Sequence, residues 1–256
     1  MEFKIEKVSF VGFGNVGSHL AFELDRQNIA VTHIYTRNQT NVKSLATEIN
    51  AELVEKIADL PDDQLVIVCV PDSAIAAVID HIPENCPVAY TSGSTELNSF
   101  STKKRLGVFY PLQTFTKGVP LNIFEVPFFI EANDDEFGRS LFDLAWLLSR
   151  KVHYASSQER KHLHLAAVWV NNFTNHMSFI ANEFLNSKDL DFELLKPLLS
   201  ETVKKLQTES PKEAQTGPAR RGDDSTISAH LKELSGHHEE LYRLITDSIK
   251  KTYSND

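Results

Sequence analysis

The chain has 256 residues, which predicts one large domain or two modest ones. Hydrophobic residues make up 41% and charged residues 24%, as in a soluble protein with a sizeable core, and no apolar run approaches the ~18 residues of a membrane span. The net charge of −9 argues against nucleic acid as the main partner.

Cysteine is rare in this sequence. Cys69 and Cys86 are too few for a disulfide framework in a chain of this length, and the N-terminal residues lack the form of a signal peptide. A cytoplasmic location with no membrane partner is therefore expected.

In the first half, strand and helix patterns alternate. Strands are expected at 4–11, 29–36, 65–70, 87–91, 106–109 and 127–131, and helices at 15–26, 40–49, 73–81 and 134–149. The run Val66–Val70 is apolar throughout, as in a strand that is buried on both faces of a parallel sheet. This rhythm predicts an α/β fold, a doubly wound parallel sheet of the Rossmann type, over residues 1–152.

The second half, residues 153–256, has helical patterns and predicts an all-α domain. Helices are expected at 158–185, 191–207, 225–235 and 237–251, with a loop at 209–218. The long helix is apolar on more than one face, with Trp169, Phe173, Phe179 and Phe184. A small helical domain can hardly bury such a surface alone, so a homodimer through this domain is expected.

A glycine triplet joins the first strand to the first helix. Gly12 would allow the tight turn, Gly14 would let the backbone approach a pyrophosphate, and Gly17 would let the helix pack on the strand. With Asn15 and Val16 between them, these residues begin a helix whose free N–H groups attract an anion. The pattern favours a dinucleotide site over an ordinary strand-turn-helix.

The end of the second strand distinguishes NADP(H) from NAD(H). No acidic residue lies between Thr32 and Thr40 to hold a ribose 2′-hydroxyl, whereas Arg37 stands where a cation would meet a 2′-phosphate. Thr36 and Asn38 add hydrogen-bond donors. NADP(H) is therefore the expected cofactor, and the alternative is that Arg37 is a solvated surface residue.

Ligands of open α/β sheets lie at the carboxyl ends of the strands. Val70 and Pro71 end a buried strand and are expected to flank the cofactor, although Pro71 can also simply terminate that strand. Further candidates follow later strands, namely the turn Ser92–Ser94, with its hydroxyls and backbone N–H groups around Gly93, and Tyr110. The alternative for the turn is a helix cap.

The long helix offers a second wall for this site. His164, Asn171 and Asn172 are seven and eight positions apart, which places them on one helical face. The alternative is a satisfied contact between helices. Arg220 and Arg221, in a glycine-flanked loop, are expected either to bind an acidic substrate or to pair with a nearby acid. No metal site is expected.

Several of these motifs resemble known families. The first domain is similar to the NADP-dependent reductases related to pyrroline-5-carboxylate reductase, the β-hydroxyacid dehydrogenases and the F420-dependent NADP oxidoreductases. The whole chain resembles Rossmann-like proteins with a DUF2520 domain, through Gly12–Gly17, Val70–Asp72, Thr91–Ser94, Pro111–Phe115, His164–Phe173, and Gly217–Asp223 followed by His230-Leu231.

The resemblance implies an NADP-dependent oxidoreductase with a helical dimerisation domain, and it implies that Ser92, Gly93 and Ser94 contact substrate. Two positions depart from the related patterns. Tyr110 replaces a histidine that often precedes Pro-Leu-Gln-Thr-Phe, and Val168 stands where β-hydroxyacid dehydrogenases have a catalytic lysine. The proton donor is therefore expected to be His164 or Tyr110, with Asn172 beside it.

Three functions fit these observations. The first is an NADP(H)-dependent oxidoreductase for a small, anionic carbonyl or imine substrate bound at an interdomain cleft. The second is a non-catalytic NADP-binding sensor or dimeric interaction protein, because a convincing acid–base pair is missing. The third is an F420- or flavin-coupled NADP reductase.

Overall fold

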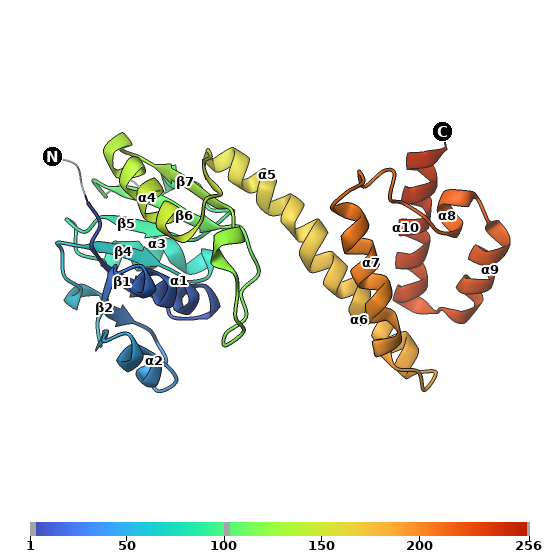
Figure 1. Cartoon of the computed structure of the whole chain (residues 1–256), viewed down its shortest axis with the longest axis horizontal. Helices are drawn as coiled ribbons and strands as arrows, with labels where there is room; N and C mark the ends of the chain where they lie inside the picture. The colour runs from blue at the N-terminus through green and yellow to red at the C-terminus, as the bar shows by residue number, and fades with distance from the viewer. Residues whose placement is uncertain (1–3, 100–102, 255–256) are drawn as a thin grey trace. The chain divides into compact units, whose positions relative to one another are not determined.

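The computed structural model describes residues 4–99 and 103–254, which divide into two compact units, 1–172 and 173–256. Helical structure that begins at Ser157 continues across this division, in the segments Ser157–Ala167, Val168–Phe173 and Thr174–Asn186 (Figure 1). The expected division at residue 152 stays a prediction, because compactness alone does not define a domain that folds by itself.

The first unit holds one sheet with the strand order β3-β2-β1-β4-β5-β6-β7-β8. Its strands are β1 (Lys7–Val11), β2 (Ala30–Tyr35), β3 (Glu52–Val54), β4 (Leu65–Val68), β5 (Val88–Tyr90), β6 (Leu106–Pro111), β7 (Phe128–Ala132) and β8 (Val152–Tyr154). The helices between them are α1 (Asn15–Arg26), α2 (Lys43–Glu48), α3 (Asp72–His81) and α4 (Asp135–Leu148), with 3₁₀ turns at Ile57–Asp59, Leu97–Ser99 and Ile123–Glu125.

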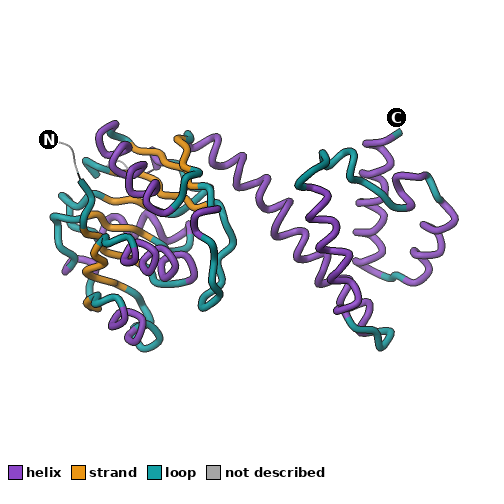
Figure 2. The backbone as a smooth tube through the Cα atoms, viewed as in Figure 1, coloured by secondary structure: helices purple, strands orange, loops and turns teal. Residues whose placement is uncertain are grey.

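Two apolar layers cover the sheet. One joins α1 and α4 to residues such as Phe10 and Phe109, and the other joins α3 to residues such as Val68 and Tyr90. Figure 2 shows the strands as a single layer among these helices. The expected Rossmann-type α/β fold is therefore confirmed, and so is the buried strand at Val66–Val68.

The sheet is not wholly parallel, which corrects one expectation. β6 and β7 pair antiparallel, with Tyr110 opposite Phe129, while every other neighbouring pair is parallel. The segment between β6 and β7 has a 3₁₀ turn but no α-helix, so it does not make the crossover that parallel strands need. The expectation also missed β3 and β8, whose three residues each are too short to show a period.

The second unit is helical, as expected. It contains α6 (Thr174–Asn186), α7 (Lys196–Leu206), α8 (Pro218–Arg221), α9 (Asp224–Glu233) and α10 (Gly236–Tyr253), with a 3₁₀ turn at Phe192–Leu195. The helix α5 (Ser157–Ala167) belongs to the first unit and begins with a capping box formed by Ser156 and Glu159. The long predicted helix departs from α geometry at Val168–Phe173, which is π-helical.

Candidate functional site

The turn between β1 and α1 needs glycine at two positions for different reasons. Gly12 has φ +91°, and a Cβ there would lie 2.3 Å from the carbonyl oxygen of Cys69. A Cβ on Gly17 would lie 2.4 Å from the carbonyl oxygen of Gly12. These contacts hold the turn tightly against the end of β4, because any side chain there would force the backbone apart.

Gly14 is different, because no atom lies within 4 Å of the position of its missing Cβ. It is the N-cap of α1 and provides no side-chain cap for the first amides of that helix. The open space and the helix N-terminus lie together, so the turn fits a pyrophosphate that approaches the backbone.

The ends of β2 and β4 lie beside this turn. The amide of Gly12 donates to the carbonyl oxygen of Tyr35, at 2.8 Å, and Val70 Cγ1 lies 3.0 Å from the missing Cβ of Gly12. Thr36, Arg37 and Asn38 follow Tyr35 directly, and Arg37 and Asn38 are exposed. The structure thus brings the predicted cofactor residues of three segments to one edge of the sheet.

A loop after β6 also reaches this edge, and the sequence did not predict that it would. His19 Nε2 lies 3.0 Å from the carbonyl oxygen of Val119, and the His19 ring packs edge-on against Phe115. Lys117 Nζ lies 3.5 Å from the carbonyl oxygen of Asn41, in the segment that follows Arg37. The loop therefore packs on α1 and extends to the β2–α2 connection.

The turn after β5 is organised by its own hydroxyl groups. The Ser92 hydroxyl accepts from the amides of Ser94 and Thr95, at 3.2 and 3.0 Å, and donates to the Thr95 hydroxyl at 2.9 Å. Because Ser92 is buried and its hydroxyl bonds stay within the turn, its side chain stabilises the shape of the turn. The Ser94 hydroxyl donates to the carboxylate of Asp72, at the start of α3.

Tyr110 packs on this turn and meets α5. A Cβ on Gly93 would lie 2.5 Å from the Tyr110 ring, so only glycine permits this approach. The Tyr110 hydroxyl lies 3.2 Å from Nδ1 of His164. Burial raises the pKa of Tyr110 to about 12, against the opposing effect of Arg160, so the phenol keeps its proton at neutral pH. The two expected proton donors therefore form one pair.

Arg160 is central to the same region, although the sequence reasoning missed it. Its guanidinium is fully buried and donates to the carbonyl oxygens of Ser92 and Thr95, at 2.8 and 3.0 Å. It also pairs with the carboxylate of Glu131 on β7, at 2.5 Å. The available signal was its position four residues before His164, which places both side chains on one face of α5.

Asn171 and Asn172 lie in the π-helical segment and are exposed. Because a π-helical turn closes over one more residue than an α-helical turn, each residue rotates by less than about 100°. From this smaller rotation we expect Asn172 to lie toward the direction of His164 and Asn171 to lie away from it. The expectation that the amides share the face of His164 stays a prediction.

Arg220 and Arg221 were expected in a glycine-flanked loop, but they lie in the short helix α8, between its caps Gly217 and Gly222, in the second unit. Arg220 stacks on the ring of Tyr253, with its guanidinium carbon 4.1 Å from the ring centre. Asp223 caps α9, and hydrogen bonds from the backbone and side chain of Thr226 lower the pKa of Asp223 to about 2. The proposed contact of the two arginines with substrate stays a prediction.

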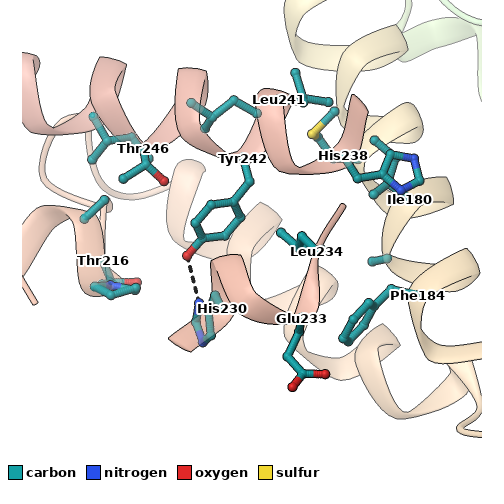
Figure 3. A pocket seen from close by; sticks show the side chains of 16 residues that line it. Ile180, Phe184, Thr216, His230, Glu233, Leu234, His238, Leu241, Tyr242 and Thr246 are labelled. Carbon is teal, nitrogen blue, oxygen red and sulfur yellow. Dashed lines mark hydrogen bonds between the residues drawn. The ribbon is translucent and has the colours of Figure 1, made fainter. Parts of the chain in front are cut away.

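The second unit contains a pocket of about 550 Å³ lined by α6, α9 and α10 (Figure 3). Its walls are mainly apolar, with Ile180, Phe184 and Leu241 among them. One polar pair stands in it, since His230 Nδ1 lies 2.7 Å from the Tyr242 hydroxyl.

Among residues 4–99 and 103–254, no helix is long and apolar enough to span a membrane. Over the same ranges, no three His, Cys, Asp or Glu side chains are grouped so as to hold a metal ion.

The sheet and the helical C-terminal region together define a Rossmann-like α/β protein. Residues 7–88 match the family model for NADP oxidoreductase, coenzyme F420-dependent, and residues 126–249 match the domain of unknown function DUF2520. A putative NADP oxidoreductase from Bacteroides fragilis, known from a crystal structure, is 36% identical in sequence, with a TM-score of 0.89, covering 96% of this chain and 98% of that one. The chain therefore belongs to the same family as this NADP oxidoreductase, with an F420-dependent-type NADP oxidoreductase region and a DUF2520 region, as the sequence motifs implied.

More distant structures share the fold. An imine reductase from Myxococcus stipitatus, solved with NADP⁺, is 11% identical with a TM-score of 0.65, covering 97% of this chain and 93% of that one. A 1-pyrroline-5-carboxylate reductase from Streptococcus pyogenes is 15% identical with a TM-score of 0.63, covering 96% and 98% respectively. No curated protein matches the chain.

Proposed function

We propose that this protein is an NADP(H)-dependent oxidoreductase that reduces a C=O or C=N bond in a small substrate. The observation that carries the proposal is the pair of Tyr110 and His164, 3.2 Å apart, in the same unit as an open glycine turn at the start of α1. Hydride transfer to a carbonyl or imine needs a proton donor within hydrogen-bond reach, and this pair can supply one.

The cofactor site is assigned to the edge of the sheet. The amides at the start of α1, beside Gly14, would bind the pyrophosphate, and Arg37, with Thr36 and Asn38, would bind the 2′-phosphate. Val70 and Pro71 would flank the nicotinamide half. When bound, NADPH supplies the hydride that the side chains cannot.

The residues of the turn and of α5 then hold the substrate and move the proton. Gly93 lets Tyr110 lie against the turn, and the phenol can donate its proton to the substrate heteroatom. His164 can return a proton to Tyr110 through Nδ1, and its exposed ring can exchange protons with water. Ser94 and Asn172 are assigned to orient the substrate.

The proposed substrate class draws on the fold relatives. They include an imine reductase and a 1-pyrroline-5-carboxylate reductase, which favours a substrate with a C=N bond or the related C=O bond. That Arg220 and Arg221 hold an anionic substrate at an interdomain cleft stays a prediction. Arg220 already stacks on Tyr253 within its own unit.

We also propose that the protein forms a homodimer through its helical region. Trp169 and Val170 are 64% and 74% exposed, and α6, α7 and α10 add Phe179, Leu198 and Leu244. Apolar surface of this extent is typical of an interface. Sedimentation equilibrium should give twice the chain mass, and a monomer at all concentrations would exclude the dimer.

A titration followed by an activity screen tests the function. NADPH should bind and be oxidised with at least one member of a panel of oxo acids, ketones and cyclic imines. Tight binding with no turnover would favour a sensor or interaction protein instead. Turnover that requires added flavin or F420 would favour the coupled reductase.

A further inference from the structure

Arg160 is charged and buried, and the proposed function assigns no role to it. A full positive charge lies at 0% exposure, where burial of an ion costs several kcal/mol. Replacing a buried ion pair with apolar residues often leaves stability unchanged or improves it, so stability alone does not explain such a pair. We propose that Arg160 is a positioning residue, which holds the Ser92–Thr95 turn in the shape that receives substrate. This inference rests on the proposed reductase function.

The contacts of the guanidinium support this role. Nη1 donates to the carbonyl oxygen of Ser92 and Nη2 to that of Thr95, so one rigid fork joins both ends of the turn. Nε and Nη2 bind Glu131, and Nη2 also reaches the Ser157 hydroxyl at 3.1 Å. Glu131 therefore balances the charge, while the carbonyl contacts determine the geometry.

The same arginine connects the turn with the proton-transfer pair. Arg160 and His164 are one helical turn apart on α5, and His164 meets Tyr110. Tyr110 in turn packs on Gly93, between the two carbonyl groups that Arg160 holds. Arg160, the Ser92–Thr95 turn, Tyr110 and His164 are thus linked by successive contacts. A shift of the turn would therefore displace the Tyr110 hydroxyl. A misplacement of about 1 Å can cost on the order of 100-fold in rate.

Two variants separate positioning from stability. Arg160→Lys keeps the charge beside Glu131 but lacks the planar fork that joins the two carbonyl groups. The double variant Arg160→Met with Glu131→Met removes both charges, so that no unpaired ion remains buried, and also removes the donors to Ser92 and Thr95. Lys161→Met is the matched control, because it removes an exposed ion pair with Glu96 from the next position of α5.

The experiment measures melting temperature, NADPH dissociation constant, and kcat/KM per NADPH-binding site for the best substrate of the panel. We expect Arg160→Lys and the double variant to fold and bind NADPH, with kcat/KM lower by about 10- to 100-fold. Lys161→Met should match the wild type. A purely structural role would instead give stability and kcat/KM that recover together in Arg160→Lys.

The outcomes distinguish this inference from the proposed function. If the wild type is active and both Arg160 variants keep its kcat/KM, or lose activity only in proportion to folded protein, the positioning role is wrong and the reductase function stands. If the wild type binds NADPH and reduces nothing in the panel, the proposed function fails and the positioning role fails with it.

Discussion

The hydroxyl of Tyr110 lies 3.2 Å from Nδ1 of His164, which joins a buried strand residue to an exposed helix residue. Burial raises the pKa of Tyr110 to about 12, which keeps the phenol protonated at neutral pH, and the exposed ring of His164 connects the phenol with solvent. The pair therefore combines a stable donor with a route for its reprotonation.

Removing the phenolic proton tests this pair directly. Tyr110→Phe should lower kcat by about 100-fold or more, the usual contribution of a positioned general acid, while NADPH affinity stays unchanged. His164→Ala should lower kcat to a lesser degree. Steady-state kinetics with parallel NADPH titrations checks both, and a Tyr110→Phe protein with full kcat would remove this residue from the mechanism.

Gly93 should tolerate no side chain. In Gly93→Ala the new Cβ would meet the Tyr110 ring at 2.5 Å, so either the ring or the turn must move, and kcat/KM should fall by about 10-fold or more. Gly138→Ala in α4 is the matched control, because its Cβ would find no atom closer than 3.5 Å. Equal activity in the two variants would contradict the tight contact.

Arg37 should distinguish the two dinucleotides. Arg37→Ala should weaken NADPH binding by about 10- to 100-fold, the range for a lost hydrogen bond to a charged group, and leave NADH binding nearly unchanged. Fluorescence titration with both cofactors checks this expectation. Equal weakening of the two would show that Arg37 does not contact the 2′-phosphate.

The π-helical segment predicts a difference between two neighbouring amides. Asn172→Ala should lower kcat/KM and leave NADPH binding unchanged, whereas Asn171→Ala should have little effect. The reason is that residues of a π turn rotate less per position, so only Asn172 is expected on the side of His164. Kinetics of the two single variants decides. A larger loss in Asn171→Ala would show that the expected rotation is wrong.

Asp223 should contribute to stability in acid. Its folded pKa is about 2, below the ordinary 3.8, so its stabilising effect is complete above the unfolded value and is lost as pH falls through about 2. Wild-type stability should therefore fall more steeply than that of Asp223→Asn between about pH 4 and pH 2. Urea unfolding across this range measures it, and parallel curves would refute the shift.

Local patterns predicted much of the fold. The glycine turn and the apolar strand at Val66–Val68 each depend on neighbouring residues, and the structure has both. The short strands β3 and β8 depend instead on pairing at the edges of the sheet. The π-helical segment gives no pattern that differs from that of an α-helix.

The site was predictable in part for the same reason. Tyr110 and His164 stood out by residue type, but their contact joins positions 54 apart in sequence. Arg160 lies 29 positions from Glu131 and 68 from Ser92, and an arginine near the start of a helix usually reads as solvated. The burial of Arg160 can be recognised only in the three-dimensional structure, where these distant residues meet.

Isotopic labelling of the cofactor shows directly whether a hydride is transferred from NADPH to the substrate. Wild-type protein is incubated with NADPH that carries deuterium in place of both hydrogens at the nicotinamide C4 position, together with the best carbonyl or imine substrate, and the product is analysed by mass spectrometry. An NADPH-dependent reductase should give a reduced product with deuterium on the former C=O or C=N carbon. A product without deuterium, or no product from any member of the panel, would contradict the proposed function.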